Sequence, residues 1–222
     1  NDKYIKKTPW DQRAIALDTF EILEYSENVL QNLTNHGHYT IKINPLESKD
    51  ILHKYGFYYC DTLIEPYCKK ADFIKYEKSE ISINNQWELS ELINICHGAF
   101  NYDRFHRDFN IDGKLADLRY DFWLQDIYQQ GNVFALMYNQ EIAGFFAYDK
   151  NKILLHALKS DYRGKGLAKY FWTVACEELF NMGYNEISSS ISAANMAILN
   201  LYSSLGFKFR NPVDIYHKII SS

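Results

Sequence analysis

A short segment in the C-terminal half of the chain brings glycines and basic residues together in the order Arg163-Gly-Lys-Gly166-Leu-Ala168. An apolar run of strand length, residues 153–158, precedes it, and a helical pattern begins at Leu167. The first turn of a helix carries free backbone N–H groups and the positive end of the helix dipole, and glycine lets an anion approach the main chain closely. These residues therefore predict a site for a phosphate or a pyrophosphate group.

Other phosphate-binding patterns fit this segment less well. A Walker A loop has four residues between its glycines and ends in Gly-Lys-Ser/Thr, and neither feature is present. A dinucleotide-binding fingerprint needs a third small residue where Lys169 stands, and it opens a longer series of strand–helix–strand units. A glycine-containing loop taken alone is also typical of an ordinary tight turn, so further motifs have to decide.

A second pattern lies further along the chain and comprises Asn195, Ile198, Tyr202, Gly206 and Phe207. Asn195 and Tyr202 are separated by about two helical turns and so share one helix face. A phenol has a pKa of about 10, close to that of an alkyl thiol, and is suited to protonate a leaving thiolate. Taken alone, Tyr202 is more simply a packing residue, because the chain contains 18 Tyr.

The elements around these motifs predict a mixed α/β fold. Helical periodicity is present at residues 87–100, 114–130, 167–180 and 195–205. Strand patterns occupy residues 133–138, 141–148, 153–158, 186–190 and 213–219. The first three of these strands are joined by short polar turns, which predicts an antiparallel meander.

Residues 1–76 predict a smaller α/β lobe in front of a main domain at residues 77–222. The elements expected in this lobe are a short helix at residues 47–54 and strands at residues 18–23, 39–43 and 58–64. We expect the last of these strands to stop at Glu65-Pro66, because proline cannot donate to a strand ladder.

The Arg-x-x-Gly-x-Ala loop at residues 163–168 and the pattern at residues 195–207 together resemble the GNAT superfamily of N-acetyltransferases. The resemblance implies a GNAT fold, in which helices flank a mixed, mostly antiparallel central sheet. It makes residues 1–76 a truncated GNAT-like lobe. It also implies an enzyme that uses acetyl-CoA and transfers acetyl directly to a primary amine.

The same resemblance assigns roles to individual residues. The coenzyme-binding residues in the loop are Arg163, Gly164, Lys165, Gly166, Leu167 and Ala168. The pantetheine arm is expected to bond the main chain of Ala157 and Leu158, and Tyr202 is the expected general acid. Asn195 either bonds the pantetheine or caps the helix that follows it.

The sequence does not single out a general base. His156 lies on the coenzyme strand and could take a proton at neutral pH, but a lone strand histidine is more often a hydrogen-bonded core residue. Asp117 and Asp121, one helical turn apart, are alternatives whose simpler role is a solvated helix face. An amine on a sugar ring is less basic than lysine, so a chain of water molecules is a further alternative.

The region before the coenzyme strands resembles the bacterial dTDP-fucosamine (dTDP-4-amino-4,6-dideoxygalactose) N-acetyltransferase family, through Arg104-Phe105 and the pattern Tyr120-x-x-Trp123. Those enzymes acetylate the 4-amino group of a nucleotide-linked sugar during cell-surface polysaccharide synthesis. The acceptor-binding residues predicted from this region are Arg104, Phe105, Arg119 and Tyr120, to which His156 of the coenzyme strand is added. Arg104 would pair with the acceptor phosphates, and a solvated loop is the alternative, because five aspartates balance the local positive charge.

Composition argues against several other classes of protein. The net charge of −4 and the pI near 6.0 disfavour nucleic acid as a partner, and no apolar stretch reaches membrane-spanning length. The four Cys have neither Cys-x-x-Cys spacing nor a nearby histidine pair, so we expect reduced thiols and no metal. We expect a cytoplasmic enzyme with a small-molecule amine acceptor, and a homodimer is compatible with the resemblance.

Two other functions stay open at this point. One is a GNAT enzyme that acetylates a peptide, a polyamine or an antibiotic amine, which a panel of acceptors assayed with a thiol reagent would distinguish. The other is a non-catalytic module that binds acyl-CoA without turnover, and the intact Tyr202 argues against it.

Overall fold

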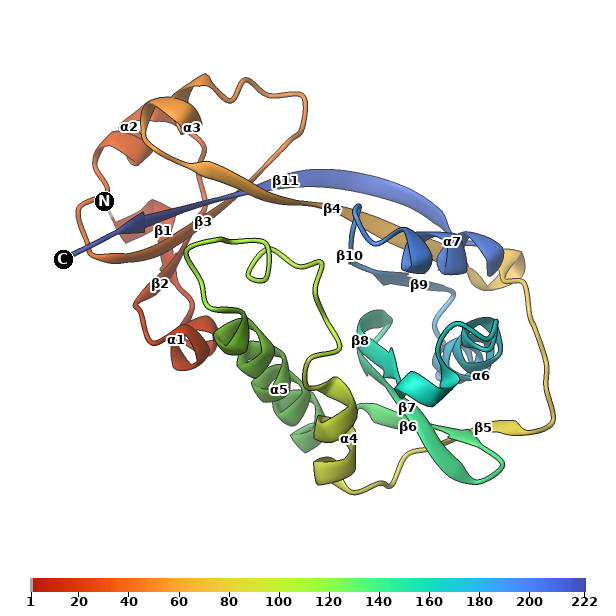
Figure 1. The fold of residues 1–222 in the computed structure, drawn as a ribbon. Helices are drawn as coiled ribbons and strands as arrows, with labels where there is room; N and C mark the ends of the chain where they lie inside the picture. Colours follow the sequence, from red (N-terminus) through yellow and green to blue (C-terminus); the bar gives the residue numbers. More distant parts are fainter. Residues whose placement is uncertain (1) are drawn as a thin grey trace.

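The computed structural model describes residues 2–222, whose strands form one continuous sheet (Figure 1). The strands lie in the order β1-β2-β3-β11-β4-β9-β8-β7-β6-β5, and β10 pairs with β4 outside this path. Their bounds are β1 Ile5–Lys7, β2 Thr19–Ile22, β3 Gly37–Ile43, β4 Tyr58–Lys69, β5 Ile81–Asn84, β6 Val133–Tyr138, β7 Glu141–Asp149, β8 Lys152–Leu158, β9 Glu186–Ser189, β10 Ile191–Ser192 and β11 Lys208–Ile220.

Helices flank this sheet. The α-helices are α1 Pro9–Ile15, α2 Glu27–Gln31, α3 Asp50–Lys54, α4 Leu89–Cys96, α5 Gly113–Gln129, α6 Ala168–Asn181 and α7 Met196–Ser204. The 3-10 helices are η1 Asp2–Tyr4, η2 Lys70–Asp72 and η3 Ser160–Tyr162. Among the described strands, the pairs β2–β3 and β8–β9 are parallel and the others are antiparallel. The predicted fold class, a mixed and mostly antiparallel sheet between helices, is confirmed.

Two hydrophobic clusters pack against opposite faces of β6, β7 and β8. Helices α6 and α7 cover one face, where Phe171, Trp172 and Tyr202 are buried. Helices α4 and α5 cover the other face, where Leu92 and Leu124 are buried. Because burial of a large apolar side chain contributes roughly 1.5–3 kcal/mol, the two clusters hold β8 firmly between two helical layers. No helix in the described part of the chain is long and apolar enough to cross a bilayer.

The strands β4 and β11 connect the N-terminal part of the sheet to the C-terminal part. They run side by side across the molecule (Figure 1), and β11 is bonded to β3 on one side and to β4 on the other. The last strand of the chain therefore completes the sheet of the first seventy residues or so. The division into residues 1–76 and 77–222 stays a prediction, and the sheet passes through both parts.

The expectation that a strand stops at Glu65-Pro66 is wrong, because β4 continues to Lys69. On one side of β4, the β10 partners reach Ile64 and the β9 partners begin at Tyr67. Pro66 lies in the gap between them, where a missing N–H breaks no ladder. Proline usually ends a strand, but here β4 continues through Pro66 because the short strands β9 and β10 pair with β4 on either side of that residue.

Helix α4 is shorter than the predicted helix at residues 87–100, and this difference shapes the site. The helix ends at Cys96, and Gly98 follows with φ 73°. The segment after Gly98 therefore leaves the helix axis and borders the cavities described below. Helix α1 was not predicted, although Thr8-Pro9 is a typical helix start. Helix α3 begins at Asp50 rather than at residue 47.

Candidate active site

Strands β8 and β9 separate after a short parallel contact. Their paired residues are Lys152 with Ser188 and Ile153 with Ser189. Beyond this contact β8 continues to Leu158, whereas the chain after Ser189 turns to pair with β4 through β10. The sheet thus opens into a V, and one edge of β8 is left without a strand partner.

The direction of the β8 main chain decides which amides face the opening. The N–H of Lys159 donates to the Ala143 carbonyl at 2.7 Å, and register then places Ala157 opposite Phe145. Because alternate residues of an antiparallel pair bond the neighbour, Ala157 points its main chain toward β7. The main-chain groups of His156 and Leu158 point into the opening instead. This geometry favours His156 over the predicted Ala157 as a main-chain contact and keeps Leu158.

The predicted pyrophosphate loop lies at the open end of the V. Gly164 and Gly166 have φ values of 68° and 69°, which glycine adopts without strain, and Leu167 precedes α6 with no side-chain cap. The first N–H groups of α6 therefore remain available to a ligand. Arg163 donates from Nε to the Leu158 carbonyl at 2.7 Å, which ties the loop to the end of β8.

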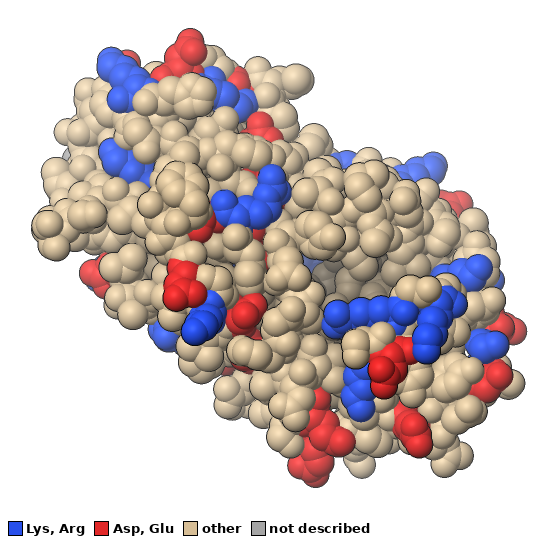
Figure 2. Space-filling view, viewed as in Figure 1, with Lys and Arg blue, Asp and Glu red and all other residues tan. Residues whose placement is uncertain are grey.

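A cavity of about 480 Å³ joins this loop to the end of β8 and to α7. Its wall includes residues 156–158 of β8, most of residues 162–169, and Asn195 and Leu201. The space-filling view shows a hollow at the place that α7, β8 and the start of α6 surround in Figure 1, with Lys and Arg side chains beside it (Figure 2). A glycine loop, a helix N-terminus and an open strand edge thus face one space.

A second cavity of about 350 Å³ adjoins the first. Residues of β8, residues 189–192 and α5 contribute to its wall. Both cavities are bordered by Ala99, Phe100, Tyr102, His156, Asn195 and Ile198. The two spaces therefore meet at the middle of the V, beside the His156 imidazole.

Tyr202 lies directly behind His156. The Tyr202 hydroxyl and the His156 Nε2 are 2.9 Å apart, and the phenol side chain is 0% exposed. Its ring packs against Phe207, and the imidazole lies against the edge of Trp172. Burial raises the pKa of Tyr202 and lowers the pKa of His156 to about 4. At neutral pH the pair is therefore a neutral phenol bonded to a neutral imidazole.

The structure locates the other predicted chemical groups. The Asn195 Oδ1 accepts from the Ile198 N–H at 3.3 Å, so Asn195 caps α7 while it also borders both cavities. Asp117 bonds His106 at 2.7 Å, and Asp121 bonds His97 at 2.6 Å. Neither aspartate borders either cavity. Of the three predicted candidates for the general base, His156 is therefore the one that borders both cavities.

Arg104 and Arg119 lie together at the wall of the second cavity. Asp11 pairs with both, at 3.5 Å from Arg104 Nη2 and 2.7 Å from Arg119 Nε. Within residues 2–222 it is their only salt-bridge partner, so two guanidinium groups share one carboxylate. Tyr120 and Lys42 border the same cavity. The predicted residues Arg104, Arg119 and Tyr120 are thus brought together there.

Phe105 does not face the cavity, contrary to the prediction that it contacts the acceptor. It is 1% exposed, and the guanidinium carbons of Arg104 and Arg119 lie 4.2 Å and 4.6 Å from its ring centroid. The Phe105 ring therefore packs against both guanidinium groups and helps to fix their positions. Asp11, Lys42 and Asp61 were not among the predicted acceptor-binding residues. Lys42 and Asp61 border the cavity from β3 and β4, and Asp11 of α1 pairs with the two arginines.

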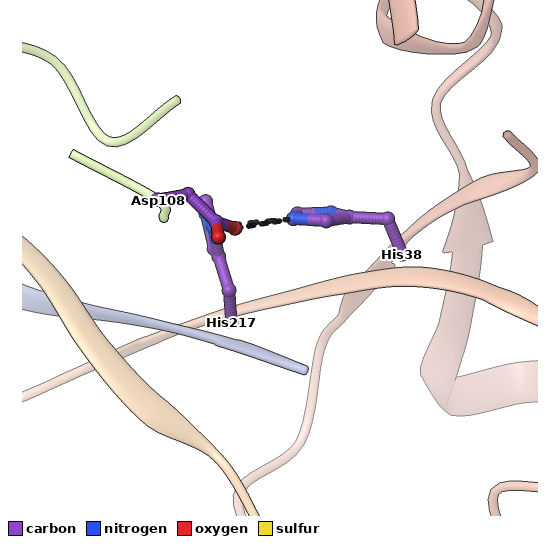
Figure 3. Close-up of side chains that lie close together, drawn as sticks. All are labelled: His38, Asp108 and His217. Atoms are coloured by element: carbon purple, nitrogen blue, oxygen red, sulfur yellow. Dashed lines mark hydrogen bonds and ion pairs between the residues drawn. The ribbon is translucent and has the colours of Figure 1, made fainter. Parts of the chain in front are cut away.

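A buried group beside Arg104 has the composition of a metal site (Figure 3). His38, Asp108 and His217 place one ligand atom each within 4.8 Å of the others. However, Arg104 donates to the His217 Nε2 at 3.2 Å, so that nitrogen must be unprotonated. The proton of neutral His217 then lies on Nδ1, which donates to Asp108 at 2.8 Å. This tautomer has no Nδ1 lone pair for a metal, and the group serves to hold Arg104.

The chain is similar to known acetyltransferases in sequence profile and in fold. Residues 99–207 match the acetyltransferase (GNAT) family, and no curated protein matches the chain. A GCN5-related N-acetyltransferase from Sphaerobacter thermophilus aligns over 98% of this chain and 76% of its own, with a TM-score of 0.62 and 10% identity. A GNAT-family acetyltransferase from Colwellia psychrerythraea aligns over 90% and 78%, with a TM-score of 0.59 and 11% identity.

A conserved protein from Staphylococcus epidermidis is similar to the same extent. It aligns over 94% of this chain and 88% of its own, with a TM-score of 0.62 and 14% identity. At such identities these structures show a shared fold. The family match covers the V-shaped opening, the glycine loop and the helix with Tyr202. Residues 99–207 thus match the acetyltransferase (GNAT) family, and the chain shares the fold of these structures.

Proposed function

We propose that this protein transfers an acetyl group from acetyl-CoA directly to the primary amine of a small acceptor. The observation that carries the proposal is the meeting of two cavities at the His156–Tyr202 pair. The cavity with the glycine loop suits the coenzyme, and the cavity beside Arg104 and Arg119 suits the acceptor. Their junction is where a thioester carbon and an amine nitrogen would come into contact.

The chemistry needs one C–N bond to form, the C–S bond to break, and two protons to move. His156, with a pKa of about 4, is too weak a base to deprotonate an alkylammonium ion, so the amine must bind in its neutral form. After attack, the imidazole can accept the proton that the nitrogen loses. Because the Tyr202 hydroxyl borders neither cavity, its proton would reach the departing thiolate through the His156 imidazole, and the proton that the nitrogen gives to the imidazole would restore the phenol.

The main chain of His156 and Leu158 would act on the acyl-pantetheine portion. Their N–H groups point into the opening and can bond carbonyl oxygens, as an added strand would. The loop at residues 163–168 would hold the pyrophosphate through N–H groups, with Arg163 and Lys165 supplying positive charge. These contacts use the coenzyme residues that the sequence resemblance assigned, with His156 in the place of Ala157.

For the acceptor, we propose the 4-amino group of a nucleotide-linked amino sugar. The sequence resemblance at residues 104–123 supports this class, and so does the charge at the cavity wall. Arg119 bonds Asp11 through Nε, while its two terminal nitrogens donate to no group within residues 2–222. A diphosphate would accept from these free N–H groups. Arg104 is held by Thr40, His217 and Asp11 and contributes mainly positive charge.

A panel of amines tests the proposal. The panel contains a dTDP-linked 4-amino-4,6-dideoxy sugar, a peptide with a free N-terminus, spermidine and an aminoglycoside, and release of the coenzyme thiol is measured. We expect the sugar nucleotide to give the highest kcat/KM. A preference for the peptide, the polyamine or the antibiotic would replace the acceptor class, and acetyl-CoA binding without thiol release for any amine would indicate a non-catalytic module.

A further inference from the structure

Asp61 is a fully buried carboxylate that borders the acceptor cavity from β4. Its Oδ1 accepts three hydrogen bonds, from the Thr62 N–H at 2.8 Å, the Ser192 hydroxyl at 2.7 Å and the Arg107 Nη1 at 2.6 Å. Its Oδ2 has no partner within residues 2–222. One oxygen of this side chain is thus fully bonded and the other is unused.

An unbonded carboxylate oxygen in the interior is unfavourable, and native structures seldom retain one without a reason. Asp61 holds Arg107 and Ser192 in place, and it does so through Oδ1 alone. Burial raises the pKa of Asp61 above its ordinary value, and the Ser192 hydrogen bond and the Arg107 charge offset only part of that rise. The free Oδ2 can therefore accept a hydrogen bond from a donor group of a ligand in the cavity.

The surrounding charges determine the kind of donor. Arg107 already neutralises Asp61, and Lys42, Arg104 and Arg119 border the same cavity. The other carboxylate in its lining, Asp103, is paired with His106. A second ammonium group, as in a polyamine, would meet repulsion from these cations. A hydroxyl group supplies a hydrogen-bond donor without adding charge.

We propose that the Asp61 Oδ2 binds a hydroxyl group of the acceptor, which makes the acceptor a hydroxylated amine of the amino-sugar type. Asp61 and Ser192 belong to one arm of the V, whereas His156 belongs to the other arm. The bonded hydroxyl is therefore a different group from the reacting amine, and the contact sets the orientation of the sugar. This inference rests on the proposed function and specifies how its substrate is recognised.

Asp61→Asn tests the contact, because asparagine keeps the shape and can keep the Oδ1 bonds while it places an NH₂ group at the Oδ2 position. With a dTDP-linked 4-amino-4,6-dideoxy sugar, we expect the acceptor KM to rise about 10- to 100-fold, as for loss of a hydrogen bond to a charged group. The dissociation constant of acetyl-CoA should stay within about threefold of the parent value.

Two control variants separate recognition from structure. Asp214→Asn alters a carboxylate on the neighbouring strand that bonds the Thr62 hydroxyl at 2.7 Å and does not border the cavity, and its acceptor KM should stay at the parent value. Arg107→Met removes the cation from Asp61 but leaves Oδ2 in place. A rise in KM in Arg107→Met as large as that in Asp61→Asn would show that Asp61 acts only by holding Arg107, which overturns the inference.

Deoxy analogues identify the bonded hydroxyl. For one of the two analogues, the 2-deoxy or the 3-deoxy sugar, the kcat/KM of the parent enzyme should be about 10- to 100-fold lower than for the full sugar. Asp61→Asn should have the same kcat/KM for that analogue as for the full sugar. Equal losses in the parent and in Asp61→Asn would overturn the contact while leaving the acetyltransfer function intact. If the parent releases no thiol, the proposed function fails, and calorimetric binding of the same sugar nucleotide then tests the Asp61 contact. Binding by the parent that is lost in Asp61→Asn would support the contact. The absence of binding by the parent would overturn it.

Discussion

At the scale of single residues, the proposed chemistry depends on a histidine and a tyrosine that are joined by a hydrogen bond. His156 is one of the residues that border both cavities, and Tyr202 lies behind it in the core. A neutral phenol bonded to a neutral imidazole can pass a proton toward a thiolate without placing a charge in the apolar cluster.

Tyr202→Phe removes the hydroxyl and keeps the ring. We expect kcat to fall about 100-fold or more, because proton transfer to the leaving thiolate is lost. The dissociation constant of acetyl-CoA should change by less than about threefold, because the phenol does not border the coenzyme cavity. Tyr148→Phe, at another buried tyrosine of the same cluster, is the control. A kcat at the parent level in Tyr202→Phe would exclude the proposed acid.

Arg119→Gln tests the anion-binding wall of the acceptor cavity. Asp11 keeps its pairing with Arg104 in this variant, so the fold is spared. We expect the acceptor KM to rise about 10-fold for a sugar nucleotide and to stay unchanged for the same amino sugar without phosphates. Arg13→Gln, which removes a surface pair with Asp126, is the matched control. Equal effects on both acceptors would contradict a phosphate contact.

The residues that line the cavity with the glycine loop were predictable from sequence, whereas those that line the second cavity were only partly so. The glycines of the loop and Tyr202 follow a spacing that one loop and one helix impose. Lys42 and Asp61 belong to β3 and β4, and long-range strand pairing brings them to the cavity. Asp11 of α1 pairs with the two arginines of the cavity wall. No local pattern carries that information.

At the scale of elements, the V between β8 and β9 is the feature that creates the site. Close packing of β7 against β8 helps to shape it, because a Cβ at Gly144 would lie 2.3 Å from the Ala157 carbonyl oxygen. The glycines of the loop have a different purpose. A Cβ at Gly166 would meet no atom within 4 Å, so its requirement is the φ of 69° and the free approach of a ligand.

Gly144→Ala and Gly166→Ala should therefore fail in different ways. We expect Gly144→Ala to lower the free energy of unfolding by about 1–3 kcal/mol, because β7 and β8 must move apart. Gly166→Ala should cost about 1–2 kcal/mol for the left-handed backbone and weaken acetyl-CoA binding more than 10-fold. Chemical denaturation and coenzyme titration measure the two quantities. Unchanged coenzyme affinity in Gly166→Ala would contradict the role of the loop.

The segment between α4 and α5 is pinned by one histidine between two carboxylates. His106 bonds Asp103 through Nδ1 and Asp117 through Nε2, the latter at 2.7 Å. Burial lowers the pKa of His106, but the two carboxylates outweigh it, and the net effect raises the pKa above 6.5. A raised folded-state pKa means that this stabilisation is complete below the unfolded-state pKa and is lost as pH rises through the folded-state value.

His106→Gln should remove this pH dependence. Between about pH 6 and pH 9, the parent should lose thermal stability relative to the variant as the imidazolium deprotonates. The melting temperatures of both proteins across this range provide the test, with His36→Gln, at an exposed histidine, as the control. A difference between parent and variant that does not depend on pH would show that His106 acts only by packing.

Element types were easier to predict than element ends. The helix at residues 114–130 and the three-strand meander were found nearly to the residue, because long periodic patterns define them. The ends of β4 and α4 were missed. In both cases a tertiary neighbour decided the end, namely the paired strands β9 and β10 for β4 and the turn at Gly98 for α4.

At the scale of the whole molecule, the N-terminal part is built into the active site. It supplies Asp11, Lys42 and Asp61 to the acceptor cavity or its wall, and it supplies both strand partners of β11. The sequence resemblance predicted this part as a separate lobe. That division stays a prediction, and the sheet pairs the last strand of the chain with strands β3 and β4 near its beginning.

A fragment of residues 77–222 should therefore not fold alone. β11 would lose all of its ladder partners and expose Ile215 and Tyr216, which are buried in the full chain. Circular dichroism and cooperative thermal unfolding measure this, with the full chain as the reference. A fragment that unfolds cooperatively and binds acetyl-CoA would support the predicted boundary near residue 76 and contradict a single folding unit.

The central claim is that acetyl-CoA lies in the V, with its thioester at His156 and its pyrophosphate at the glycine loop. Amide chemical shifts recorded during titration with acetyl-CoA test it most directly. The account predicts the largest changes at the N–H groups of His156, Leu158 and residues 164–168, with smaller changes along α7. Saturable binding that leaves those amides unchanged, or no binding at millimolar acetyl-CoA, would contradict it.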